Sequence, residues 1–216
     1  MPSGHQVWAV GAVVAVIWLA LLFVAGISGN FDQFSKINSI VPVLVLGAAL
    51  FERYAWLWPP LHPHLVRTPV LRGTWEGDLE SLWVDPVTGA KPPKKVVYFT
   101  VKQTLTTISV RLHTDESSSE QITGTLGTNQ SGQRVIASTY MNTPRIEHRE
   151  RSRPHYGGVV LTVFGDPPTR LEGEYWTDRM SKGSLVFRRY SPQIADSYEA
   201  AKALSVQRVN EGSPGS

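Results

Sequence analysis

The chain has 216 residues, a formal net charge of +3 and no cysteine. The lack of cysteine excludes a disulfide scaffold and any cysteine-based metal or nucleophilic site. The mildly basic balance is compatible with an anionic ligand or with lipid headgroups, and the length suits a small membrane anchor joined to one folded domain.

An uncharged apolar run covers residues 7–27. As a helix it is about 31 Å long, which matches the roughly 30 Å hydrocarbon core of a bilayer. A signal peptide is the alternative, but residues 1–6 lack a basic region and the run is longer than the apolar part of a signal peptide. The run therefore predicts a transmembrane helix.

A second apolar run covers residues 37–58, with Glu52 and Arg53 inside it and Trp56 and Trp58 at its end. Aromatic side chains are typical of the membrane interface. We predict that residues 1–58 form a transmembrane hairpin with helices over about 7–27 and 37–58. The few basic residues near the helix ends favour a cytoplasmic location for the rest of the chain.

Small residues give these two predicted helices faces on which they could assemble. An ionisable residue such as Glu52 often faces an interior or water-lined surface, although its side chain can also extend to the interface. The candidate assembly residues are Gly11, Ala15, Gly47 and Glu52.

Residues 59–71 are rich in proline and predict a linker. His62 and His64 lie on either side of Pro63, and two histidines can contribute to a metal site. Because no further ligand lies nearby in the sequence, we favour the linker and predict no metal.

Residues 72–190 alternate between apolar and polar positions and are divided by short turns. Ile108, Val110 and Leu112 share one face of their strand, for example, whereas Ser109 and Arg111 share the other. Such spacing predicts a mostly antiparallel sheet, folded as a sandwich or a closed barrel. The eight expected strands cover residues 72–84, 95–103, 106–113, 120–126, 133–141, 158–164, 170–176 and 184–190.

The last part of the chain predicts a short helix and a free tail. Ser191 and Pro192 are typical of a helix start, and Ile194, Tyr198 and Leu204 follow at helical spacing. We place this helix at residues 191–206, with its first turn at 192. Residues 207–216 are polar and predict a disordered tail.

The sequence contains no nucleophile elbow, phosphate-binding P-loop or zinc-binding helix motif, so we expect a binding domain and not an enzyme. Tyr and Trp can stack on bases, and Arg can pair with phosphate. The same residues could instead only pack or cap turns. The candidate ligand-binding residues are Arg111, Tyr140, Asn142, Arg145, Tyr175, Trp176, Thr177 and Arg179.

Residues 145–155 hold four arginines, at positions 145, 149, 151 and 153. Such a run is typical of a solvated loop. Contact with anionic lipid is a second interpretation.

Taken together, the motifs resemble the SMODS-associated two-transmembrane, β-strand-rich effectors of bacterial CBASS antiphage systems. The matching segments, in order, are Gly73-x-Trp75-x-Gly77, residues 103–112 (QTLTTISVRL), residues 116–119 (ESSS), Asn142-x-Pro144-Arg145, His155-x-Gly157-Gly158, residues 175–179 (YWTDR) and Phe187-Arg188-Arg189. The resemblance implies an eight-stranded, closed, lipocalin-like antiparallel barrel. It also implies that this barrel senses a cyclic nucleotide made by a CD-NTase, without enzyme activity.

The resulting expectation is a multi-pass protein of the bacterial inner membrane with its barrel at residues 72–190 in the cytoplasm. Binding of a cyclic di- or trinucleotide would make the helices of several copies assemble and disrupt the lipid bilayer. We expect no cofactor and no direct contact with DNA or RNA. The alternative is a membrane-tethered, lipocalin-like carrier of a small apolar ligand, and an enzyme of unknown type comes third. The polarity of the barrel interior discriminates between receptor and carrier.

Overall fold

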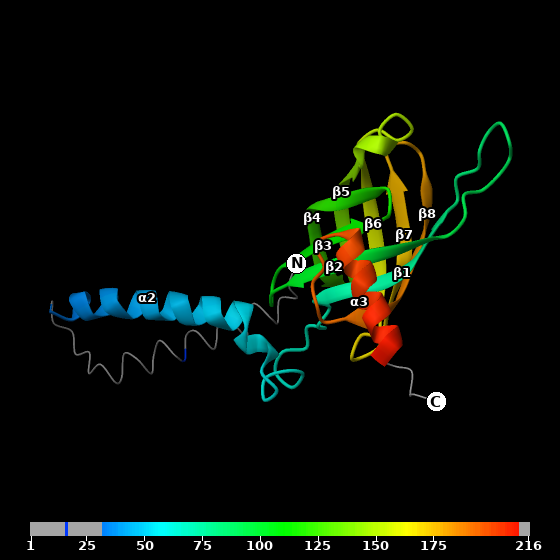
Figure 1. The fold of residues 1–216 in the computed structure, drawn as a ribbon. Coiled ribbons are helices and arrows are strands. Elements are labelled where there is room, and N and C mark those ends of the chain that lie inside the picture. The colour runs from blue at the N-terminus through cyan, green and yellow to red at the C-terminus, as the bar shows by residue number, and fades with distance from the viewer. Residues whose placement is uncertain (1–15, 17–31, 212–216) are drawn as a thin grey trace. The chain divides into compact units, whose positions relative to one another are not determined.

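The computed structural model describes residue 16 and residues 32–211 of the chain (Figure 1). These residues belong to two compact units. Of the described residues, one unit contains 69–103 and 107–211. The other contains those up to 68 together with 104–106.

The unit with the residues up to 68 contains the helix α2 (Asp32–Arg53) and the single 3-10 turn η1 (Ala55–Leu57). No helix in the described part of the chain is both long enough and apolar enough to cross a membrane. The predicted transmembrane hairpin is therefore wrong for these residues, and the multi-pass inner-membrane location that depended on it is not supported.

The physical reason is that the uncharged part of α2, residues 37–51, is only about 22 Å long as a helix, shorter than the roughly 30 Å hydrocarbon core. The helix begins five residues before the predicted start at 37 and so includes Asp32 and Lys36 in addition to Glu52 and Arg53. It also ends at Arg53, so the tryptophans that were expected to complete the span lie outside it. The other predicted helix, residues 7–27, lies outside the described residues.

Of the four candidate assembly residues, Gly11 and Ala15 also lie outside the described residues. Gly47 lies on α2, and a Cβ added there would meet nothing within 4 Å. The carboxylate of Glu52 accepts hydrogen bonds from the backbone N–H and the hydroxyl of Thr106, at 3.0 and 2.8 Å. Glu52 therefore holds a turn within this unit.

Eight antiparallel strands form the other unit and close into a barrel, because β1 pairs with both β2 and β8. The closed antiparallel barrel agrees with the sequence-based expectation. The strands are β1 (Gly73–Ser81), β2 (Lys95–Gln103), β3 (Ile108–His113), β4 (Ser117–Thr128), β5 (Arg134–Pro144), β6 (His155–Phe164), β7 (Arg170–Thr177) and β8 (Lys182–Ser191).

Strand alternation decides which side chains fill the barrel. Ile108 and Val110 are buried in the core, as the alternation of β3 predicts, and Leu112 packs against it. Trp75, Phe99 and Phe187 are the largest side chains of this core, and the rings of Phe99 and Phe187 stack with centroids 5.2 Å apart. One end of the barrel is thereby filled with apolar side chains.

The C-terminal helix α3 (Tyr198–Glu211) begins six residues later than the predicted start at 192. The preceding segment is irregular, and the barrel holds it by hydrogen bonds: Thr74 donates to the carbonyl of Gln193, and Thr100 donates to the carbonyl of Ala195. Figure 1 shows α3 along the outside of the barrel, where Ala201 packs in a small cluster with Tyr98. Residues 212–216 of the predicted tail lie outside the described residues.

Candidate functional site

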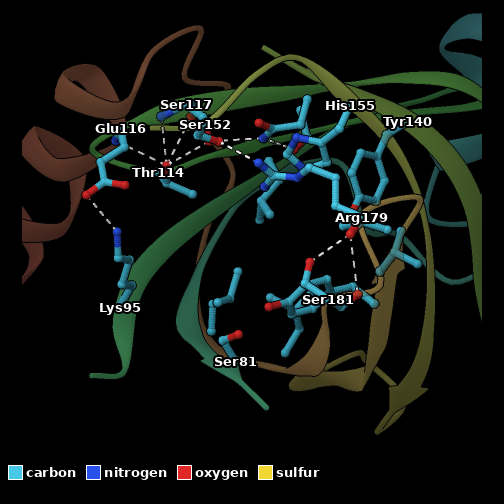
Figure 2. Close-up of a pocket in the computed structure, with 18 of the residues that line it drawn as sticks. Ser81, Lys95, Thr114, Glu116, Ser117, Tyr140, Ser152, His155, Arg179 and Ser181 are labelled. Atoms are coloured by element: carbon cyan, nitrogen blue, oxygen red, sulfur yellow. Dashed lines mark hydrogen bonds and ion pairs between the residues drawn. The ribbon is translucent and has the colours of Figure 1, made fainter. Parts of the chain in front are cut away.

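A cavity of about 510 Å³ lies inside the barrel at the end opposite the packed core. Its size falls within the roughly 300–1,000 Å³ of small-molecule sites. Side chains from all eight strands line it, together with residues of the connections 82–94, 114–116, 145–154 and 178–181 (Figure 2).

The floor of the cavity is apolar. Phe99, Val110, Val159 and Leu185 belong to the barrel core and face the cavity from four different strands. Because the core beneath them is filled, the cavity is a cup and not a channel through the barrel.

The wall of the cavity is polar, and its side chains are connected by hydrogen bonds. The Asn142 amide donates to the hydroxyls of Ser117 and Ser119, at 2.9 and 2.8 Å. Thr177 and Ser181 share a hydrogen bond of 2.7 Å across the turn that follows β7. Hydroxyl groups can rotate to donate or to accept, so this wall can bind polar atoms of either kind.

Two tyrosines stand in the same wall because glycines on neighbouring strands leave room for them. A Cβ on Gly157 would lie 2.4 Å from the Tyr140 ring, and a Cβ on Gly183 would lie 2.7 Å from the Tyr175 ring. Burial raises the pKa of Tyr140 strongly, so its phenol stays protonated at neutral pH. Aromatic faces of this kind can stack on nucleobases.

Three cationic side chains reach the cavity from different parts of the fold. Lys95 begins β2, Arg151 belongs to the connection 145–154, and Arg179 follows β7. Arg179 donates to the hydroxyl of Ser152 at 3.1 Å, and Lys95 faces Glu116 (Figure 2). Among the described residues that line the cavity, Glu116 is the only acidic one.

His155 lies at the start of β6 and also lines the cavity. Its Nδ1 donates to the carbonyl of Arg153 at 3.0 Å, because a carbonyl can only accept. Burial lowers the pKa of His155, so the ring is neutral at pH 7 and keeps its proton on Nδ1. The positive charge of the site therefore comes from the lysine and the arginines.

The cavity brings together five of the eight predicted ligand-binding residues. Alternation along β7 places Tyr175 and Thr177 inward with the buried Leu171, as their spacing indicates. The five are Tyr140, Asn142, Tyr175, Thr177 and Arg179.

The other three predicted residues lie elsewhere. Arg111 is on the outward side of β3, where it forms an ion pair of 2.8 Å with Glu120. Arg145 forms an ion pair with Glu199 of α3. Trp176 is 51% exposed on the outer face of the barrel.

Sequence reasoning missed Lys95, Glu116 and Arg151. A signal for Lys95 was present, because it shares alternate positions of β2 with the core residues Val97 and Phe99. Arg151 lies in a segment that was interpreted as a solvated loop or a lipid contact. Such a connection has no strand alternation, so its sequence does not predict the direction of its side chains.

Comparison with known proteins identifies the family. Residues 66–189 match the family described as Cap15, cyclic dinucleotide receptor domain. The chain belongs to this family. All residues that line the cavity fall within the matched segment.

A curated relative supports the same assignment. CD-NTase-associated protein 15 of Staphylococcus schleiferi is 24% identical over 185 residues, which cover 86% of this chain and 96% of that protein. Together, these two similarities support the expectation of a CBASS effector with a cyclic dinucleotide receptor domain.

Proposed function

We propose that the cup-shaped cavity binds an anionic cyclic nucleotide and that the chain acts as a receptor without catalytic activity. The observation that carries this proposal is the convergence of Lys95, Arg151 and Arg179 on a polar-walled cavity of about 510 Å³. Lysine and arginine bind phosphate through charge-assisted hydrogen bonds, and the two wall tyrosines offer surfaces for bases. Membership of a cyclic dinucleotide receptor family supports the same ligand class.

The carrier of an apolar ligand is the competing function, because the cavity floor is apolar. A carrier, however, gains nothing from burying polar hydroxyls and cations around its ligand. In the receptor, the apolar floor packs against the bases while the polar wall and the cations hold the phosphates.

The full-length chain should be tested by thermal shift and calorimetry with cyclic di-AMP, cyclic di-GMP, cyclic GMP–AMP and cyclic tri-AMP, and with palmitate as the apolar probe. A ligand at 100 times its dissociation constant stabilises the fold by about 2.7 kcal/mol. Stabilisation by a cyclic nucleotide that is recovered unchanged supports a receptor without catalysis or cofactor. Stabilisation by palmitate alone would establish the carrier instead, and nucleotide cleavage would establish an enzyme.

Arg179 provides a sharper test of the phosphate site. Replacing it with Ala removes a hydrogen bond to a charged group and should weaken binding about tenfold to a hundredfold. Arg188→Ala is the matched control, because Arg188 is 61% exposed and lies 3.8 Å from Asp78 outside the cavity. Equal affinities for both variants would remove Arg179 from the site.

We further propose, from the same family resemblance, that ligand binding makes copies of the chain assemble and that the assembly disrupts membranes. Chemical crosslinking should then detect ligand-dependent oligomers. Dye should leave vesicles of phosphatidylethanolamine and phosphatidylglycerol only when protein and ligand are both present. Ligand binding without oligomers or leakage would overturn this step and leave the receptor function in place.

A further inference from the structure

An ion-pair cluster lies at the rim of the cavity. Lys95 and Arg151 both bond one carboxylate oxygen of Glu116, at 2.9 and 3.0 Å. Asp115 lies farther from the lysine, at 3.9 Å. Because the two cations converge on a single oxygen, they define one point in space at which a negative charge is bound.

The backbone of Glu116 is fixed from both sides. Its N–H donates to the Thr114 hydroxyl at 3.1 Å, and its carbonyl accepts from the N–H of Arg145 at 2.8 Å. The same threonine hydroxyl accepts from the N–H of Ser117 at 2.8 Å, which completes the turn into β4. The backbone of Glu116 therefore cannot move without opening the turn, whereas its side chain can.

The Glu116 carboxylate is charged at neutral pH. Burial alone would raise the pKa of Glu116, but the hydrogen bonds and charges of Lys95 and Arg151 outweigh burial and lower it below its ordinary value. A phosphate that approaches the rim thus meets a like charge that already occupies the two cations.

We propose that Glu116 is an internal competitor of the ligand: in the unliganded protein its carboxylate holds the position between Lys95 and Arg151 that a phosphate of the ligand takes on binding. This inference rests on the proposed receptor function. An incoming phosphate exchanges one ion pair for another, and the glutamate side chain moves away from the rim. Anions that cannot reach both cations do not displace it, so Glu116 makes the receptor selective.

The geometry supports an exchange because the partners on either side of Glu116 remain anchored. Lys95 begins a barrel strand, and its side chain is only 33% exposed. The connection that carries Arg151 is also held by Arg179, which donates to Ser152. Lys95 and the connection that carries Arg151 therefore stay near the rim when the carboxylate leaves, and the Arg151 side chain, which is 65% exposed, is free to follow the incoming phosphate.

The test compares full-length wild type with Glu116→Gln, using whichever of the three cyclic dinucleotides named above binds the wild type most tightly. The variant keeps the size of the side chain and removes its charge. We expect calorimetry to give about tenfold tighter binding for the variant. Lys95→Ala and Arg151→Ala should each weaken binding.

Glu120→Gln is the matched control, because Glu120 also lies on the barrel in an ion pair of 2.8 Å, with Arg111, but does not line the cavity. Its affinity should equal that of the wild type. A melting temperature measured for each variant separates a loss of folding from a change of affinity.

The outcomes distinguish the two proposals. Unchanged or weaker binding by a folded Glu116→Gln variant, alongside a wild type that binds, overturns the competitor role and leaves the receptor function standing. If neither wild type nor variant binds any member of the panel, the receptor function itself fails and the competitor role falls with it.

Discussion

The side chain of Gln121 takes the place of a strand neighbour on β3. β3 and β4 pair directly only from Arg111–Glu120 to His113–Ser118. Beyond that point, the Gln121 amide accepts from the N–H of Val110 at 2.9 Å and donates to the carbonyl of Ile108 at 3.0 Å. One residue thereby satisfies two backbone groups where the two strands separate.

Replacing Gln121 with Ala should lower the free energy of unfolding by about 2 kcal/mol, because partly buried backbone groups lose their partners. Urea denaturation measures this change. Gln133→Ala in the exposed turn before β5 is the control and should change stability little. Equal stabilities for the two variants would contradict the bridging role of Gln121.

His113 makes the stability of the barrel depend on pH. It is 3% exposed, and burial followed by the charge of Arg111 lowers its pKa, although Asp196, Glu120 and Glu199 oppose the shift. The unfolded chain takes up a proton near the ordinary pKa of 6.5, whereas the folded chain does so only at lower pH.

The contribution of His113 to stability is therefore complete above about pH 6.5 and is lost as the pH falls below that value. Melting temperatures measured from pH 7.5 to about pH 5 should decline on the acid side. His113→Gln should make this decline shallower, whatever its effect at pH 7.5. An identical acid slope for the variant would mean that other groups control the dependence.

At the scale of strands, close approach between neighbours fixes the position of certain glycines. A Cβ on Gly173 of β7 would lie 1.9 Å from the carbonyl oxygen of Val160 on the paired strand β6. A Cβ on Gly127 of β4 would meet nothing within 4 Å. Chemically identical substitutions at these two positions should therefore have very different effects.

Gly173→Ala should destabilise the barrel by about 3 kcal/mol, since the strands must move apart. Gly127→Ala should be neutral or slightly stabilising, because alanine restricts the unfolded chain. Denaturant unfolding of both variants checks the difference. A tolerated alanine at position 173 would mean that β6 and β7 adjust more freely than their pairing indicates.

The strands were predictable because one periodicity controls them. Alternation identified all eight, and in the structure the same alternation places Tyr175 and Thr177 inward with the buried Leu171. The same alternation puts Arg111 opposite Ile108, and a closed interior then excludes it from the cavity. Here the barrel, once closed, decides which of two possible faces holds the ligand site.

The remaining differences involve partners distant in sequence. Arg145 forms an ion pair with Glu199, 54 residues later. No local sequence pattern reveals that its guanidinium already has a carboxylate partner. Arg151 reaches the cavity from a connection with no strand period. The start of α3 was also misplaced, because Thr74 and Thr100 bind the carbonyls of Gln193 and Ala195 and the helix begins only after Ser197, whose hydroxyl accepts from the N–H of Ala200 at 3.1 Å.

For the molecule as a whole, the division into two units predicts that the barrel folds by itself. The strands, α3 and every residue that lines the cavity belong to one unit. A fragment of residues 66–216 should unfold in a single cooperative transition and bind the same cyclic nucleotide with the dissociation constant of the full chain. A gradual transition, or a large loss of affinity, would contradict this independence.

The closed barrel also determines how ligand binding would register in hydrogen exchange. Every strand has a paired neighbour on both sides, so away from the gap where β3 and β4 separate the amides of the strand interiors exchange mainly through global unfolding. A ligand that binds only the folded state slows all of these amides by one common factor, which equals the gain in stability. Amides of the connections 82–94 and 145–154 open locally and should instead be protected one by one, according to their distance from the ligand. A single exchange experiment would thus give the ligand's affinity from the strand amides and its position from the amides of the connections at the rim.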